Sequence, residues 1–289
     1  MKIKDILASK EVTLSYEVFP PKKDKPFGPI VTAVDKLCEA KPDFMSVTYG
    51  AGGGTGHNTV KIASHVQNDL GVTALAHLTC VSSTREQVAE AIEEIKAAGI
   101  ENILALRGDI PQGGEYPVGQ FYNYASELIT EIKQHGDFCI GAACYPEGHV
   151  ECAHRAEDLE NLKIKVDCGV DFMTTQMFFD NDIMYKFLYQ AREKGITIPV
   201  IAGIMPITTA KQLETSVKLS GTHVPVRLAN IVDKFGDKPE AMRDAGIAYA
   251  TEQIIDLVAN GVKGIHLYTM NKPEIAEKIR SNISSIIGE

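Results

Sequence analysis

The chain has 289 residues, of which 44% are apolar and 23% charged, and its formal net charge is −9. This composition is typical of a globular protein with a large core, and the acidic balance argues against a nucleic-acid partner, whose phosphates need clustered Lys and Arg. No apolar run approaches the ~20 residues of a membrane helix, and Met1–Lys10 lacks the apolar core of a signal peptide. Six cysteines without a C-x-x-C pair indicate free thiols, so we expect a cytoplasmic protein without a membrane span.

Short β-rich runs alternate with helical stretches along the whole chain. The runs are continuously apolar, as parallel strands covered on both faces should be. They are Leu14–Phe19, Phe44–Thr48, Thr73–Leu78, Asn102–Leu106, Cys139–Ala143, Phe172–Thr175, Val200–Gly203 and Gly264–Leu267. A long insertion before the last run holds predicted helices at Thr209–Ser220 and Pro239–Asn260, with a further stretch around Pro225–Phe235. The alternation predicts an α/β fold, a (β/α)8 TIM barrel in a single domain over residues 1–289, with an open doubly wound sheet as the alternative.

The helical stretches carry start and stop signals. Thr84–Ala98 is the clearest, with Thr84 and Gln87 spaced as a capping box and Gly99 as the stop. The same glycine stop before the next strand recurs at Gly71, Gly169, Gly195 and Gly261.

Polar side chains stand at nearly every predicted strand end, where a (β/α)8 barrel places its chemistry. They are Glu17, Thr48, Tyr49, His77, Arg107, Asp109, Tyr145, His149, Gln176 and Tyr268. Any one of them could simply belong to a polar loop, but the set indicates an active site.

Glu17 is the candidate general acid. It stands between Tyr16 and Val18, and desolvation there would favour the protonated carboxyl group near neutral pH. An outward-facing strand residue is the alternative.

Asp109, beside Arg107, could stabilise positive charge that develops on a substrate, or could belong to a turn with an internal ion pair.

Two further motifs fit no standard template. One is the possible metal cluster of His149, Glu151, Cys152 and His154, which lacks the spacing of a zinc site, so we expect no metal. His149, near a helix start, could instead hold an anion. The glycine-rich segment Gly50–Gly56 matches neither the dinucleotide nor the P-loop pattern and is predicted to be a loop, or a place where backbone approaches a bulky ligand.

Taken together, the motifs resemble those of methylenetetrahydrofolate reductase, in family order from about residue 14 to 272. They are Ser15-Tyr-Glu-Val-Phe-Pro-Pro-Lys22, Ser46-Val-Thr-Tyr-Gly50, Ala76-His-Leu-Thr-Cys80, Leu106-Arg-Gly-Asp109, Tyr145-Pro-Glu-Gly-His149, Thr175-Gln-Met-Phe-Phe-Asp180, Gly203-Ile-Met-Pro206 and His266-Leu-Tyr-Thr-Met-Asn271. The resemblance implies a barrel that holds FAD and reduces 5,10-methylenetetrahydrofolate to 5-methyltetrahydrofolate by a ping-pong route, with NAD(P)H as electron donor.

The resemblance also implies roles for individual residues. Glu17 would be the acid that opens the five-membered ring of the folate, and Asp109 would hold the pterin and favour the resulting cation. Substrate contacts would come from Asp109, Gln176, Gln212, Lys272 and Thr48. Contacts with FAD would come from Thr48, Tyr49, Ala51, His77, Arg107, Gly108, Asp109, Tyr124, Ala125, Tyr145, His149, Asp158, Asn161 and Lys165.

Three positions depart from the family pattern. Ile164 replaces an Arg that contacts the flavin phosphates, Ser216 replaces a Phe that helps to hold NADH, and Lys272 replaces an Arg that contacts folate. Ser216 leaves open an alternative in which the chain is the flavin-bearing catalytic subunit of a larger complex and receives electrons from a partner protein. A non-catalytic folate- or flavin-binding module and an unrelated phosphate-binding barrel are further alternatives. The family also implies a homo-oligomer.

Overall fold

The computed structural model describes residues 1–21, 25–49, 56–110 and 120–288. Within them, eight parallel strands close into a barrel in chain order, and β8 pairs with β1. The strands are β1 (Thr13–Val18), β2 (Phe44–Val47), β3 (Thr73–Thr79), β4 (Asn102–Leu106), β5 (Cys139–Cys144), β6 (Phe172–Thr175), β7 (Val200–Ile204) and β8 (Gly264–Tyr268). The predicted (β/α)8 barrel is confirmed, and each predicted strand agrees with the observed one to within a residue at either end.

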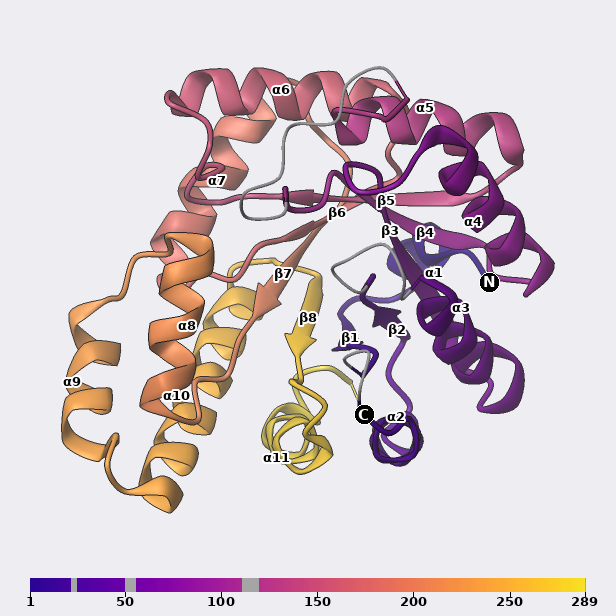
Figure 1. Ribbon diagram of the computed structural model, residues 1–289. Helices are drawn as coiled ribbons and strands as arrows, with labels where there is room; N and C mark the ends of the chain where they lie inside the picture. Colours follow the sequence, from indigo (N-terminus) through magenta and orange to yellow (C-terminus); the bar gives the residue numbers. More distant parts are fainter. Residues whose placement is uncertain (22–24, 50–55, 111–119, 289) are drawn as a thin grey trace.

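Helices surround the barrel (Figure 1). They are α2 (Gly28–Glu39), α3 (Gly56–Ser64) with the π-helical segment η1 (His65–Asp69), α4 (Arg85–Ala97), α5 (Ala125–His135), α6 (Arg155–Asp167), α7 (Asn181–Glu193), α8 (Ala210–Ser220), α9 (Val226–Phe235), α10 (Pro239–Ala259) and α11 (Pro273–Ile283). Both halves of the predicted capping box of α4 form, since Gln87 N donates to Thr84 Oγ1 at 3.2 Å and Thr84 N to Gln87 Oε1 at 2.9 Å. The insertion after β7 forms α8, α9 and α10, which Figure 1 shows together on one side of the barrel.

A short helix that the sequence analysis did not predict, α1 (Ile3–Ser9), closes the amino-terminal end of the barrel. Ile3 is fully buried in one cluster with Phe44, Leu75 and Leu104 from three strands. The Ile3 N–H donates to Asn102 Oδ1 at 2.8 Å, which anchors the helix to β4. Because α1 fills this end, ligands must enter at the opposite end, where the strands terminate.

The alternation of side chains along β1 determines what faces the interior. Leu14, Tyr16 and Val18 belong to the large core between the strands and the helices. Because successive side chains of a strand point to opposite faces, Ser15 and Glu17 point into the barrel.

Candidate active site

Glu17 lies inside the barrel between two buried histidines. Its Oε2 is 3.7 Å from His77 Nε2 on β3 and 3.6 Å from His266 Nε2 on β8. The Glu17 side chain is 20% exposed, and both imidazoles are buried. The predicted partial desolvation of this carboxyl group is therefore confirmed, and the alternative of an outward-facing side chain is wrong.

Two serines fix the imidazoles that face Glu17. Ser46 Oγ and His77 Nε2 share a hydrogen bond of 2.8 Å, as do Ser15 Oγ and His266 Nδ1. Burial lowers the pKa of His77 to about 4, although the nearby Glu17 opposes this shift. His77 is therefore neutral at pH 7, and it faces Glu17 as a polar ring and not as the cation of an ion pair.

A second group of polar side chains lies where β4 and β5 end. Arg107 forms a two-pronged ion pair with Glu151, at 2.5 and 2.8 Å, and the Glu151 N–H donates to His149 Nδ1 at 3.2 Å. The His149 and Tyr145 rings meet edge-to-face with centroids 4.7 Å apart. Burial lowers the pKa of His149, and the Arg107 guanidinium lowers it further. The group thus carries a neutral imidazole beside a fixed cation.

Lys165 reaches the same region from α6. Its Nζ donates to the carbonyl oxygen of Ala143 near the end of β5. Burial lowers the pKa of this ammonium group, while Cys144 and Asp158 oppose the shift. Asp158 lies about two turns earlier on α6, and Asn161 stands exposed between them. A second cation is therefore close to the strand ends, although no carboxylate bonds to it within the described residues.

The backbone and an unsatisfied hydroxyl also mark this end of the barrel. Gly108 has φ +85°, and a Cβ there would stand 3.0 Å from Thr79 Cβ, so this position requires glycine. Thr174 Oγ1 on β6 is buried and has no hydrogen-bond partner within the described residues. Because Phe172, two residues earlier, belongs to the interior cluster, Thr174 also points into the barrel. Buried polar atoms are usually paired, so this hydroxyl is available to a ligand.

A third group lies where β6, β7 and β8 end. Gln176 is half-buried, and its N–H donates to Cys144 O at 2.7 Å. Gln212 Nε2 donates to Pro206 O at 3.0 Å, so its amide is engaged within the β7–α8 loop. Gln212 and Lys272 nevertheless line one small hollow together with Tyr268. The structure thus brings two of the predicted folate contacts together.

The remaining predicted residues are more scattered. Asp109 is exposed after β4, and Thr48 and Tyr49 follow β2 half-buried. Tyr124, which is 62% exposed, caps α5, and Ala125 is the first residue of that helix. Ala51 lies outside the described residues.

Sequence reasoning assigned no role to His266, Ser15 or Ser46. All three stand at positions of their strands whose side chains point into the barrel. A histidine between Ile265 and Leu267 in an apolar strand is the signal that could have identified His266. Which serine faces which imidazole depends on strand pairing, and only the three-dimensional register supplies it.

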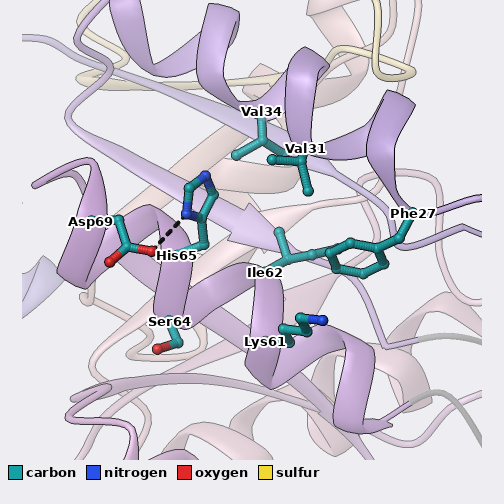
Figure 2. A pocket seen from close by; sticks show the side chains of 8 residues that line it. All are labelled: Phe27, Val31, Val34, Lys61, Ile62, Ser64, His65 and Asp69. Carbon is teal, nitrogen blue, oxygen red and sulfur yellow. Dashed lines mark hydrogen bonds and ion pairs between the residues drawn. The ribbon is translucent and has the colours of Figure 1, made fainter.

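A separate cavity of about 460 Å³ lies on the outer wall of the barrel, between α2 and α3 with η1. Figure 2 shows its apolar wall and the His65 imidazole that points to Asp69. His65 Nδ1 is 2.7 Å from Asp69 and its Nε2 is 2.8 Å from Asp35 on α2. Burial lowers the pKa of His65, but hydrogen bonds to Asp69 and Asp35 outweigh it, and the net shift is upward. The His65 imidazole therefore links α2 to η1 through Asp35 and Asp69.

We expect His65→Gln to destabilise the protein more at acid than at alkaline pH. The raised folded-state pKa means that the stabilisation by the imidazolium is fully present below the unfolded value of 6.5 and is lost as the pH rises through the folded value. Because His65 is 28% exposed, the difference in unfolding free energy should be about 0.5–1 kcal/mol at pH 5.5. Urea titrations at pH 5.5 and 8.5 measure it. Exposed His57, paired with Glu94, provides the control His57→Gln, and an equal pH dependence in both variants would contradict the assignment.

Within the described residues, no group of three or more His, Cys, Asp or Glu side chains is arranged to hold a metal ion. No helix in the same residues has both the length and the apolar character needed to cross a membrane.

Polar and titratable side chains gathered at the carboxyl ends of a closed parallel barrel are the arrangement in which (β/α)8-barrel enzymes place their active sites. A family model described as methylenetetrahydrofolate reductase matches residues 2–284. The chain belongs to this family.

Named relatives agree with the family assignment. Methylenetetrahydrofolate reductase (NADH) 1 of Arabidopsis thaliana is 36% identical over 99% of this chain, and the chain spans 50% of that protein. The 5,10-methylenetetrahydrofolate reductases of Pectobacterium carotovorum and Escherichia coli K12 are 35% and 34% identical over 93% of this chain, which covers 89% and 90% of them. The chain therefore spans about half the length of the plant relatives and most of the bacterial ones.

Solved structures share the fold at low identity. An uncharacterized protein from Clostridium thermocellum that binds two copies of 5-methyl-5,6,7,8-tetrahydrofolic acid has a TM-score of 0.62 at 17% identity, covering 99% of this chain and 98% of its own. Oxaloacetate acetylhydrolase follows with a TM-score of 0.58 at 11% identity, covering 100% of this chain and 88% of its own. At these identities the likeness shows the barrel fold alone.

Proposed function

We propose that residues 1–289 form one FAD-binding barrel domain that reduces 5,10-methylenetetrahydrofolate to 5-methyltetrahydrofolate by a ping-pong route, with NAD(P)H as electron donor. The observation that carries the proposal is the Glu17 carboxyl group, held between two buried imidazoles inside the barrel of a chain from this family. A protein that only binds a ligand needs no proton donor in such a position.

The residues at the ends of β4 and β5 fit FAD. Arg107 and Lys165 supply cations for its diphosphate, and Gly108 allows the backbone a close approach. The Thr174 hydroxyl supplies a hydrogen bond that nothing in the described residues uses. When bound there, the flavin would supply the hydride that passes from donor to folate.

Glu17 would donate its proton to the ring nitrogen that leaves the methylene carbon of the folate. That bond breaks with its electrons going to the protonated nitrogen, and the methylene carbon becomes part of an iminium cation that accepts the hydride. The neutral imidazole of His77 and the imidazole of His266 hold the carboxyl group in place, because serines fix both rings. The step requires a carboxyl group within reach of the leaving nitrogen, and the position of Glu17 inside the barrel supplies one.

Three polar groups would hold the folate around this acid. The Asp109 carboxylate, after β4, would hold the pterin and stabilise the cation formed on ring opening. Gln176 would contact the folate and, in the other half-reaction, the nicotinamide. Lys272 and Gln212, which line one hollow, would contact the folate further from the reacting carbon.

A partner protein is the alternative electron donor. Ser216 is 5% exposed on α8 and presents no aromatic ring where the family pattern has a Phe that helps to hold NADH. This position favours a chain that receives electrons from another subunit, with the same folate chemistry.

Anaerobic stopped-flow absorbance at the flavin band tests both proposals. FAD-reconstituted protein would be mixed with NADH or NADPH, and the reduced protein then with methylenetetrahydrofolate. We expect bleaching by a nucleotide and reoxidation by the folate. Bleaching by neither nucleotide, with reoxidation of chemically reduced protein intact, would establish the partner-fed alternative. Failure of the folate to reoxidise the flavin would overturn the proposed reaction.

A further inference from the structure

The turn after β8 is fastened to the segment of β1 that carries Glu17. Thr269 Oγ1 donates to the carbonyl oxygen of Glu17 at 2.6 Å. The Asn271 side-chain amide donates to Phe19 O at 3.0 Å and accepts from Phe19 N at 3.1 Å. The pairing of β1 with β8 ends at Glu17 and Tyr268. Beyond that pair, the Asn271 side-chain amide makes the bonds to Phe19 that the backbone of a continuing strand would otherwise make. Bonds from two side chains thus hold the backbone both at the acid and two residues beyond it.

This turn adopts a conformation that few side chains tolerate. Met270 and Asn271 have φ of 53° and 54°, in the left-handed region. Asparagine tolerates this region, but methionine does so rarely, and Met270 is 40% exposed, so burial of its side chain does not account for the geometry. A bond from Asn271 N to Thr269 Oγ1, at 3.1 Å, closes the turn. Strained backbone of this kind persists where its surroundings enforce it, and often at functional sites.

The same turn delivers Lys272 to the third group of site residues. Lys272 directly follows Asn271, and its Nζ donates to Thr208 Oγ1 at 3.4 Å across the β7–α8 loop. One short segment therefore fixes the backbone of the acid on one side and presents a cation to the folate hollow on the other.

We propose that Asn271, together with Thr269, is a positioning residue for the acid. By fixing the backbone at Glu17 and Phe19, it keeps the carboxyl group between His77 and His266 and aligned with the substrate that Lys272 contacts. The bonds from Thr269 to Glu17 O and from Asn271 to Phe19 are called the clamp below. The catalytic consequence rests on the proposed function, whereas the clamp itself is a property of the fold.

Asn271→Gly isolates the clamp from the turn conformation, because glycine accepts the left-handed backbone while both bonds to Phe19 are lost. We expect reoxidation of dithionite-reduced, FAD-loaded protein by methylenetetrahydrofolate to slow by about 10- to 100-fold, with an altered pH profile, because small misplacements of a reacting group cost this much. Flavin content and the Kd for 5-methyltetrahydrofolate should stay near wild type. Asn271→Asp, which keeps the acceptor for Phe19 N, should restore part of the rate. The matched control is Lys41→Gly, at another left-handed residue (φ 48°) after α2.

Hydrogen exchange at the Phe19 amide provides a readout that does not depend on the reaction. We expect its protection to fall by at least about 10-fold in Asn271→Gly and to be unchanged in Lys41→Gly. Unchanged protection at Phe19 would overturn the clamp whatever the wild-type protein catalyses. If Asn271→Gly loses protection at Phe19 but is reoxidised by the folate at the wild-type rate, the positioning role is overturned. If the folate cannot reoxidise even the wild-type protein, the proposed function is overturned. In that case the exchange measurement still decides whether the clamp exists.

Discussion

We expect Glu17→Gln to slow the reoxidation of reduced protein by methylenetetrahydrofolate by about 10²- to 10⁴-fold, the usual contribution of a general acid. Glutamine has nearly the same shape and can lie beside the two imidazoles, which their serines hold in place, so the fold should be kept. Its amide protons are too weakly acidic to be transferred at neutral pH. The loss should therefore fall on the folate half-reaction, and flavin content and reduction by the electron donor should stay near wild type.

Single-turnover stopped flow on the two half-reactions separates these effects. The control is Glu90→Gln, the same change on the exposed face of α4. A variant that is reoxidised by the folate at nearly the wild-type rate would show that another group supplies the proton. Equal slowing of both half-reactions would point to a damaged flavin site and not to a missing acid.

The barrel could be predicted because its signals are local. Parallel strands buried on both faces have continuously apolar sequences. The helices between them end at glycines, such as Gly99 and Gly169, with φ of 74° and 111°. The helix α1 was missed because it has only seven residues and forms through burial of Ile3 in the barrel, a contact with residues far along the chain. Tertiary packing, and not local propensity, determines such an element.

The candidate site was predictable in part. Partial burial of Glu17 follows from its apolar neighbours in sequence, and the structure confirms it, with the side chain 20% exposed. The His77 and His266 imidazoles around it come from β3 and β8, and only barrel closure brings them together. The pairing of Arg107 with Glu151 likewise depends on how the β4 and β5 loops meet. The Asn271 clamp could not be read from sequence, because it depends on backbone conformation at two consecutive residues.

We expect Lys165→Met to have opposite effects on the apoprotein and on flavin binding. In the structure the Lys165 ammonium is desolvated against a carbonyl oxygen, and burial lowers its pKa. Replacing this poorly compensated charge with an apolar side chain of similar length should raise the unfolding free energy of the apoprotein by on the order of 1 kcal/mol. Loss of a charged contact with the diphosphate should weaken FAD binding by about 10- to 100-fold.

The pH dependence of the unfolding free energy distinguishes the loss of the Lys165 charge from a change in side-chain packing at this position. Because the pKa of Lys165 is lower in the folded protein than the unfolded value of 10.5, the unfolded chain binds the proton more tightly. The wild-type protein should therefore gain stability relative to Lys165→Met as the pH rises through the folded pKa toward 10.5, which urea titrations of the apoprotein at pH 7 and 10 would measure. The control Lys163→Met lies on the same helix, where Lys163 pairs with Asp167 on the surface, and it should leave FAD affinity unchanged. If Lys165→Met bound FAD as tightly as wild type, the ammonium group would remain on the Ala143 carbonyl in the loaded protein, and the diphosphate would depend on Arg107 for its cation.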